Sequence, residues 1–282
     1  MNKLKVIQLL PELNIGGVER GTKDFSKALV KNGHESIVIS NGGIFEEDII
    51  KNGGKHIKLP IHKKSIFSLL LSKKLRSIYD QEKPDIVHVR SRMPAWINYH
   101  AFKQLTKKPI LISTFHGLYS TPLYSRVMSK VDHMIAISET VKKYIIDTYK
   151  VNEKNITTIS RGCDTKHFNK TELNQDWINE WFNEYPETKD KIIITLPTRV
   201  SAWKGIDYFL ELVSKLDLNT FHGLVVGPTS PSKVKYLKSL KQKVLDLNIS
   251  KNITFTGSRD DINNIYKISD IVFNLSVKPE PF

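Results

Sequence analysis

The chain has 282 residues, of which 40% are hydrophobic, so it can bury a sizeable core and its length favours two domains over one. Its single cysteine, Cys163, excludes an intrachain disulfide and a thiolate-rich metal cluster, which fits a reducing cytoplasm. The net charge of +14 favours an anionic partner: a nucleic acid, an anionic membrane face or a phosphorylated small molecule.

Neither a leader nor a membrane span is predicted. The apolar run at residues 6–10 is too short for the apolar region of a signal peptide, and no other stretch approaches the length of a span. Lysines are spread along the whole chain, and no recognisable nucleic-acid module is present. We therefore expect a cytoplasmic protein without a nucleic-acid partner, with peripheral attachment to a surface as an alternative.

The first residues predict a strand, a loop, a helix and a second strand. Residues 6–10 form an apolar run, residues 11–17 are rich in turn formers, and apolar residues recur at helical spacing over 18–29. A second apolar run follows at 37–39. This is the pattern of a βαβ unit.

The same alternation continues to about residue 170. Because the runs are uninterrupted, we expect strands that are covered on both faces, in a mostly parallel, doubly wound sheet. The further strands are predicted at 85–89, 109–113, 133–137 and 155–159.

A second domain of the same kind is predicted at 191–282, after a polar linker at 171–190. Its strands are expected at 192–196, 224–226, 253–255 and 271–275, and the sheet is left incomplete where the chain stops. The predicted fold is therefore α/β, with two doubly wound, Rossmann-like domains, 1–170 and 191–282. They should face a crevice at the carboxyl ends of their strands.

The apolar stretch at 66–79 is flanked by lysines and has two interpretations. As a basic amphipathic helix it would lie on an anionic membrane. As the crossover before the strand at 85–89 it would pack into the core, which we favour. Both hold if only its basic edge faces lipid.

Three groups of residues are candidates for chemistry. Gly16 and Gly17 precede the first helix, where backbone amides can approach an anion, or they simply form a turn. His116 follows the strand at 109–113 and would bind a hydroxyl, exchange a proton, or serve a structural hydrogen bond. Arg199 and Lys204 flank the start of a helix in the second domain, as a diphosphate site requires, or they are solvated cations.

No metal-ligand spacing is found among the histidines, and no pair of carboxylates has the spacing of a glycoside hydrolase. We therefore expect no metal and no other cofactor.

Seven motifs in order resemble those of the retaining glycosyltransferases of family 4, which have the two-domain GT-B fold. The resemblance runs from Gly16 to Phe282. The motifs are GGVERGT from Gly16, PDIVHVRSRMPAW from Pro84, STFHG from Ser113, IAISE from Ile135, RGCDTKHF from Arg161, TRVSAWKG from Thr198 and KPEPF from Lys278.

The resemblance implies transfer of a sugar from a nucleotide-diphosphate sugar to an acceptor, with retained anomeric configuration and without a bound metal. By position, Gly16 and Gly17 match the glycine loop facing donor and acceptor, and His116 matches the histidine beside the transferred sugar. Arg199 and Lys204 match the diphosphate-binding pair. Glu280 matches the first glutamate of a Glu-x7-Glu motif that contacts the donor sugar.

The chain departs from the family at Thr198 and Cys163, and it stops before the second glutamate, so we expect a C-terminally truncated member. The acceptor is expected to be a glycan or a lipid-linked compound of bacterial envelope polysaccharide or lipopolysaccharide synthesis, at the inner face of the cytoplasmic membrane. The alternatives are a noncatalytic sugar- or lipid-binding remnant and a GT-B-like sugar-nucleotide epimerase.

Overall fold

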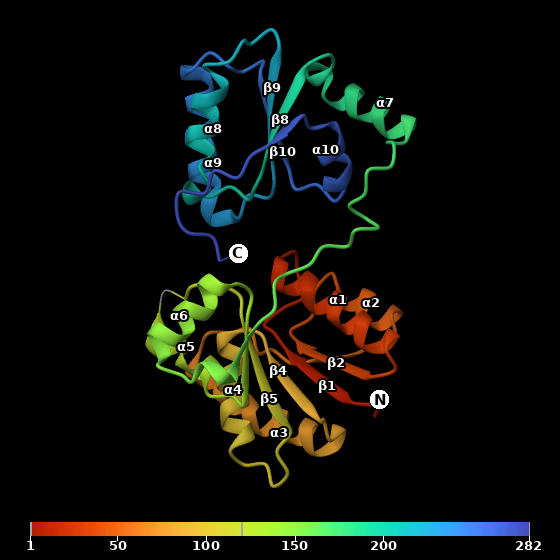
Figure 1. The fold of residues 1–282 in the computed structure, drawn as a ribbon, viewed down its shortest axis with the longest axis vertical. Helices are drawn as coiled ribbons and strands as arrows, with labels where there is room; N and C mark the ends of the chain where they lie inside the picture. Colours follow the sequence, from red (N-terminus) through yellow and green to blue (C-terminus); the bar gives the residue numbers. More distant parts are fainter. Residues whose placement is uncertain (1, 120, 282) are drawn as a thin grey trace. The chain divides into compact units, whose positions relative to one another are not determined.

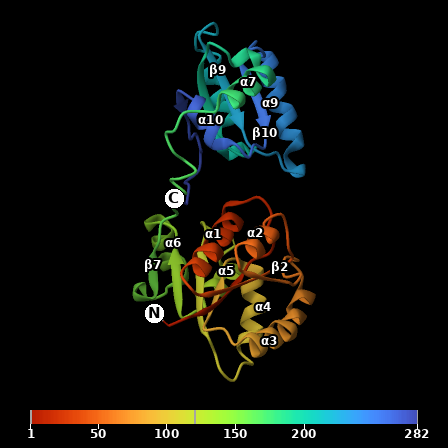
Figure 2. The ribbon, with the colours of Figure 1, turned by 90° about the vertical axis from the view of Figure 1, so that its right-hand side faces the viewer.

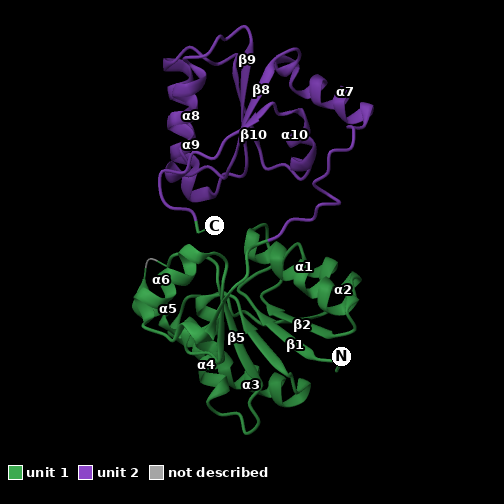
Figure 3. Ribbon diagram, in the orientation of Figure 1, with its two compact units in different colours: residues 1–161, 281–282 green, residues 162–280 purple. Residues whose placement is uncertain are grey.

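The computed structural model describes residues 2–119 and 121–281. Phe282, the last residue of the motif that ends the chain, lies outside the described residues. The chain divides into two compact units, Met1–Arg161 together with Pro281–Phe282, and Gly162–Glu280 (Figure 3). They are called unit 1 and unit 2, and each has a buried core of its own.

The described residues of unit 1 form a seven-stranded sheet in the order β3-β2-β1-β4-β5-β6-β7. All neighbouring strands are parallel, which confirms the predicted doubly wound sheet. The strands are β1 (Lys5–Leu9), β2 (Glu35–Ser40), β3 (Lys55–Lys58), β4 (Ile86–Val89), β5 (Ile110–Phe115), β6 (His133–Ala136) and β7 (Ile156–Thr158).

Helices cover both faces of this sheet, and alternating residues of the strands face them. Along β2, Ile37 and Ile39 join the main core, whereas Val38 joins a separate cluster that contains Ile49 of α2. Figures 1 and 2 both show α3 beside α4, and these two helices contact each other. The helices are α1 (Gly17–Lys31), α2 (Glu46–Lys51), η1 (Ile66–Leu70), α3 (Leu71–Glu82), α4 (Arg92–Phe102), α5 (Pro122–Ser125), η2 (Arg126–Ser129), α6 (Glu139–Tyr149) and η3 (Glu153–Asn155).

Strand β3 is an element that the sequence does not predict. Its residues, Lys55–Lys58, include a single aliphatic side chain, and they pair only with β2 at the edge of the sheet. An edge strand has one solvated side, so it does not need the apolar run that marks an internal strand.

The apolar stretch at 66–79 divides between the two interpretations. Leu75 and Tyr79 of α3 are buried in the core of unit 1, as the crossover interpretation requires. In η1, however, Ile66, Phe67 and Leu70 are 77%, 75% and 67% exposed. The second half of the stretch is therefore core, and the first half presents apolar side chains to solvent.

The described residues of unit 2 form a four-stranded parallel sheet in the order β10-β9-β8-β11. Figure 1 shows α8 and α9 on one side of this sheet and α7 and α10 on the other. The strands are β8 (Ile192–Pro197), β9 (Phe221–Val226), β10 (Ile253–Gly257) and β11 (Ile271–Val272). The helices are α7 (Gln175–Glu184), η4 (Pro186–Thr188), η5 (Ala202–Lys204), α8 (Ile206–Val213), η6 (Pro231–Lys233), α9 (Val234–Asp246) and α10 (Ile262–Ile268).

The stretch expected as a linker, 171–190, contains helix α7, and α7 is part of the core of unit 2. Trp181 is 2% exposed and packs in a cluster with Ile193 of β8 and Ile265 of α10. Its indole nitrogen donates a hydrogen bond to Thr188 Oγ1 at 3.0 Å. The boundary between the compact units lies earlier, between Arg161 and Gly162.

No helix within the described ranges, 2–119 and 121–281, is long and apolar enough to cross a membrane.

Because Trp181 closes one face of the unit 2 sheet, we expect Trp181→Ala to reduce the free energy of unfolding of that unit by about 3–5 kcal/mol. Glu180→Ala, at an exposed neighbouring position of α7, is the control and should change it by less than about 0.5 kcal/mol. Urea-dependent hydrogen exchange of unit 2 peptides measures both. An equal effect of the two substitutions would show that α7 is not part of this core.

Candidate functional site

In each unit, candidate residues gather where the strand order reverses. Strand β1 lies between β2 and β4, so the chain leaves β1 toward one side of the sheet and β4 toward the other. In unit 2, β8 lies in the same way between β9 and β11. Open parallel sheets bind ligands at the carboxyl ends of strands at such reversals.

At this edge of unit 1, Arg161 holds two of the predicted residues together. Its guanidinium donates to the carbonyl oxygen of Gly17 at 2.6 Å and to His116 Nδ1 at 2.9 Å. Gly17 is the first residue of α1, His116 follows β5, and Arg161 follows β7. Three loops that are distant in sequence therefore meet at one place.

The contact with Arg161 determines the tautomer of His116. A guanidinium only donates hydrogen bonds, so Nδ1 must accept and a neutral ring carries its proton on Nε2. Burial and the charges of Arg90 and Arg161 hold the pKa of His116 well below 6.5. Nε2 is buried and has no hydrogen-bond partner among residues 2–119 and 121–281. The ring thus offers one N–H donor, which suits a ligand hydroxyl rather than proton exchange near neutral pH.

The backbone conformation at positions 16 and 17 does not require glycine. Gly16 has φ 178°, an extended conformation open to any residue, and Gly17 is not among the glycines with positive φ. A Cβ at Gly16 would lie 2.1 Å from Glu19 Oε2, and one at Gly17 would lie 2.9 Å from Arg161 Nη1. The two glycines therefore make room for charged side chains beside the start of α1, which argues against a simple turn.

Arg90, which sequence analysis did not select, belongs to the same place. It directly follows β4 and is 8% exposed. Its Nη1 donates to Gln8 Oε1 of β1 at 2.9 Å, and its guanidinium packs against α1, where a Cβ at Gly21 would lie 3.5 Å from Nη2. The signal that could have revealed it is its position, one residue beyond the strand that borders the reversal.

In unit 2, the predicted residues Lys204 and Glu280 form an ion pair. Lys204 ends η5, just before α8, and Glu280 lies beyond β11. Ser276 Oγ also donates a hydrogen bond to the Glu280 carboxylate. Arg199 lies in the loop between β8 and η5, exposed, with its guanidinium carbon 5.8 Å from the centre of the Trp203 ring.

Electrostatics keep Glu280 ionised. Its partial burial alone would raise the pKa, but the hydrogen bonds from Lys204 and Ser276, with the charges of Lys204 and Arg199, bring the pKa below its ordinary value of 4.5. At neutral pH this part of unit 2 therefore holds two cations and one carboxylate.

Two glycines fix the loops that carry these charges. Gly205 has φ +74°, and a Cβ there would lie 2.0 Å from the carbonyl oxygen of Leu275. Gly227 has φ +154°, and a Cβ there would lie 2.2 Å from the carbonyl oxygen of Thr198. The side chain of any other residue would collide with the neighbouring backbone segment, so both positions require glycine.

The structure thus assembles Gly16, Gly17 and His116 within unit 1, and Arg199, Lys204 and Glu280 within unit 2. That the two groups face each other across a crevice stays a prediction.

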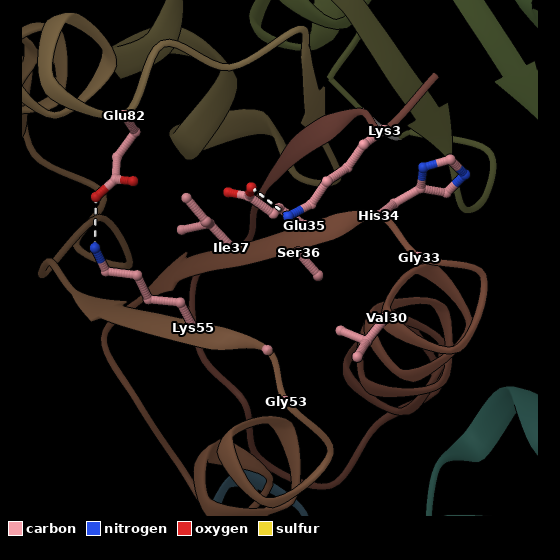
Figure 4. Close-up of a pocket in the computed structure, with 11 residues that line it drawn as sticks. Lys3, Val30, Gly33, His34, Glu35, Ser36, Ile37, Gly53, Lys55 and Glu82 are labelled. Atoms are coloured by element: carbon pink, nitrogen blue, oxygen red, sulfur yellow. Dashed lines mark hydrogen bonds and ion pairs between the residues drawn. The ribbon is translucent and has the colours of Figure 1, made fainter. Parts of the chain in front are cut away.

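A hollow of about 420 Å³ at the opposite edge of the unit 1 sheet contains none of these residues (Figure 4). It lies at the amino-terminal ends of β1, β2 and β3, and ion pairs of Lys3 with Glu35 at 2.9 Å and of Lys55 with Glu82 at 2.5 Å border it. The pair of Lys3 with Glu35 is exposed, and exposed ion pairs contribute little to stability.

In the part of the chain that the structure describes, no group of three or more His, Cys, Asp or Glu side chains is placed to hold a metal ion.

Two parallel α/β units, each with charged residues at the reversal of its sheet, are the units of a GT-B fold, and known glycosyltransferases share this fold. A crystal structure of a glycosyltransferase from Rickettsia africae is 34% identical and superposes with a TM-score of 0.87, over 99% of this chain and 75% of the other. HepE of Anabaena in complex with UDP and glucose, 18% identical, has the same fold, with a TM-score of 0.83 over 99% of this chain and 76% of the other.

Sequence profiles give the family. Residues 15–167 match Glycosyltransferase Family 4, and residues 178–282 match Glycosyl transferases group 1. An uncharacterized glycosyltransferase of Methanocaldococcus jannaschii is 26% identical over 99% of this chain and 76% of its own length. The chain belongs to glycosyltransferase family 4, which confirms the resemblance drawn from its seven motifs.

Because the pKa of His116 is held well below 6.5, we expect its ring to be neutral, with the proton on Nε2, at pH 6.5, where an ordinary imidazole is half protonated. Nitrogen-15 NMR of the imidazole distinguishes the two ring nitrogens. Arg161→Met should allow both tautomers and raise the pKa, because it removes the donor to Nδ1 and a nearby charge. A ring that takes up a proton near pH 6.5 in the unaltered protein would contradict this assignment.

Proposed function

We propose that the protein transfers a sugar from a nucleotide-diphosphate sugar to a glycan or lipid-linked acceptor with retention of anomeric configuration. The observation that carries this proposal is the cluster in unit 2, where Lys204 and Arg199 lie beside the Glu280 carboxylate at the carboxyl edge of the sheet. The two cations suit the diphosphate of such a donor, and the carboxylate suits the hydroxyl groups of its neutral sugar.

The cations would act where charge develops. As the bond from the anomeric carbon to the diphosphate breaks, negative charge grows on the departing phosphate oxygens, and Arg199 and Lys204 would stabilise it. The acceptor oxygen bonds to the same carbon on the same face, and its proton leaves with the nucleoside diphosphate or to solvent. Lys204 has three N–H donors, so it can keep Glu280 and still bind a phosphate oxygen.

The remaining residues would orient the sugar. Glu280, ionised and held by Ser276, accepts hydrogen bonds from sugar hydroxyls, and His116 donates one through Nε2. Gly16 and Gly17 make room for the side chains of Glu19 and Arg161 beside the start of α1, and their backbone amides would face the donor. In this scheme the diphosphate is neutralised by side chains alone, so we propose that transfer requires no metal ion or other cofactor.

The donor is testable by release of nucleotide from a panel of UDP-, GDP- and ADP-sugars, with and without membrane lipid extract. Lys204→Ala should reduce turnover about 100-fold or more, because a charge-stabilising donor is lost. Lys251→Ala, in the exposed turn before β10, is the control and should leave turnover unchanged.

Turnover that survives Lys204→Ala would refute the assignment of the diphosphate site. Donor binding without turnover would favour a noncatalytic remnant, and interconversion of sugar nucleotides without transfer would favour an epimerase. Addition of a chelator should leave turnover unchanged, and anomeric analysis of the product by NMR tests retention.

The acceptor side includes an apolar groove of about 360 Å³ in unit 1, formed by η1, α4 and α5. Ile66, Leu69 and Met93 line it together with the rings of Trp96 and Tyr124. Phe67 and Leu70 on η1, and Leu123 on α5, are exposed beside it. Such a concentration of exposed apolar side chains indicates an interaction surface.

Cations and aromatic rings surround this groove. Lys64 lines it, and Lys63, Lys73 and Lys74 are exposed on the adjoining segment. Tyr99 packs edge-on against Trp96. The ammonium nitrogens of Lys103 and Lys130 lie 4.4 and 4.7 Å from the centre of the Tyr99 ring. Aromatic rings and lysines around an apolar surface are typical of proteins that lie at a membrane interface.

We therefore propose that the groove contacts an anionic lipid bilayer, with the protein in the cytoplasm at the inner face of the cytoplasmic membrane. Each lysine near such a surface contributes about 1 kcal/mol, and the apolar side chains contribute more by burial. This position suits a lipid-linked acceptor of envelope polysaccharide or lipopolysaccharide synthesis.

Phe67→Ser combined with Leu70→Ser should weaken binding to vesicles containing phosphatidylglycerol at least tenfold, because two exposed apolar side chains are lost. Leu245→Ser, exposed on α9 of unit 2, is the matched control. Vesicle sedimentation measures the binding, and vesicles of phosphatidylcholine alone should bind weakly. Equal binding to both kinds of vesicle, or no effect of the double substitution, would exclude this surface.

A further inference from the structure

Arg90 is a buried cation without a carboxylate partner among the described residues. Its side chain makes a hydrogen bond to the neutral Gln8, and its Nε is buried without a partner in the ranges 2–119 and 121–281. A buried charge that lacks an ionic partner is unfavourable, so a cation of this kind is a candidate for pairing with an anionic ligand.

The described residues beneath Arg90 are neutral and supply no anion. Gln8 is fixed because its amide nitrogen donates to the carbonyl oxygen of Thr22 at 3.3 Å, which turns its oxygen toward Arg90. His88 is hydrogen-bonded to Thr114 at 2.7 Å, and burial and the charge of Arg90 lower its pKa to about 3, so it is neutral. The polar layer under Arg90 is therefore uncharged.

The groups around Arg90 at the open edge of the sheet are mostly positive or donors. Burial and the charge of Arg161 lower the pKa of Arg90 to about 10, so Arg90 stays charged at neutral pH. His116 presents its Nε2–H nearby, and α1 begins at Gly17 with its positive end. Within the described ranges, Glu19 is the one carboxylate whose charge acts on Arg90, and it does so less than Arg161.

We propose that Arg90 and Arg161 form a binding site for an anionic group, a phosphate or a carboxylate, carried by one of the two substrates. This rests on the proposed transfer reaction only for the identity of the molecule that carries the anion. Because Arg199 and Lys204 already serve the donor diphosphate in unit 2, the acceptor is the favoured source. Arg90 would then select acceptors that carry a negative charge.

Direct binding tests the site without any transfer reaction. In the full chain, titration with inorganic phosphate should shift the imidazole nitrogen-15 resonance of His116 Nε2. Arg90→Met, which removes the charge and keeps much of the volume, should weaken this binding at least tenfold, and Arg90→Lys should restore part of it. Arg76→Met on α3 is the control and should change nothing. Hydrogen exchange of unit 1 peptides verifies that each variant is folded.

Two further measurements identify the source of the anion. If the acceptor carries it, Arg90→Met leaves the affinity for the donor's nucleoside diphosphate unchanged and raises the KM of the acceptor. If the donor carries it, the affinity for the nucleoside diphosphate falls at least tenfold. Either result supports the site. A folded Arg90→Met variant that binds phosphate and both substrates as the unaltered protein does would overturn it.

The two proposals can fail separately. Phosphate binding that depends on Arg90, in a protein that releases no nucleotide from any sugar donor, would retain this site and refute the transfer reaction. Turnover in a protein that does not bind phosphate at Arg90 would retain the transfer reaction and refute this site.

Discussion

The site of each unit depends on one topological constraint, the reversal of strand order in a parallel sheet. In unit 1, β1 lies between β2 and β4, and in unit 2, β8 lies between β9 and β11. The chain turns away in opposite directions at each reversal, so the backbone there is not covered by a crossover helix. The functional candidates Arg90, Gly17 and Lys204 each lie beyond the carboxyl end of a strand that borders a reversal. The order of the strands places them there, and the local conformation of the chain does not.

Charge is distributed unequally over these edges. In unit 1, Arg90 makes no ion pair with any described residue, and the charge of Glu19 acts on it only weakly, whereas in unit 2 the charge of Lys204 is opposed directly by Glu280. A ligand of Lys204 or Glu280 must compete with or share an existing ion pair, and an anionic ligand of Arg90 would supply an ionic partner that no described residue provides. The mixed charges in unit 2 suit a donor that is bound through both its phosphate and its hydroxyl groups. The positive charge in unit 1 suits an anionic group.

The periodicity of apolar residues predicts the internal strands. It does not predict elements and side chains whose place depends on contacts with residues far away in the sequence. Internal strands such as β1 and β8 have uninterrupted apolar runs because both faces are buried, whereas the edge strand β3 lacks one. Trp181 belongs to an apolar helical pattern, but its polar surroundings indicated a linker, and only packing against Ile193 and Ile265 reveals its role. Arg90 looks like any cation after a strand, because its burial depends on α1, which is far from it in sequence. Five of the six site residues were selected from their places beside predicted strands and helices, and the family motifs alone marked Glu280.

Each half of the candidate site is built inside one unit. The contacts that hold His116 come from Arg161, and those that hold Glu280 come from Lys204 and Ser276, so neither half requires the other unit for its own geometry. Substitutions in the two halves should then be nearly additive in their effects on stability, as for distant sites in general. Their effects on turnover would be coupled in the proposed transfer, because Glu280 and His116 are proposed to bind the same sugar. Coupling that appears in turnover and not in stability is therefore the physical signature of a substrate that bridges two separately folded sites.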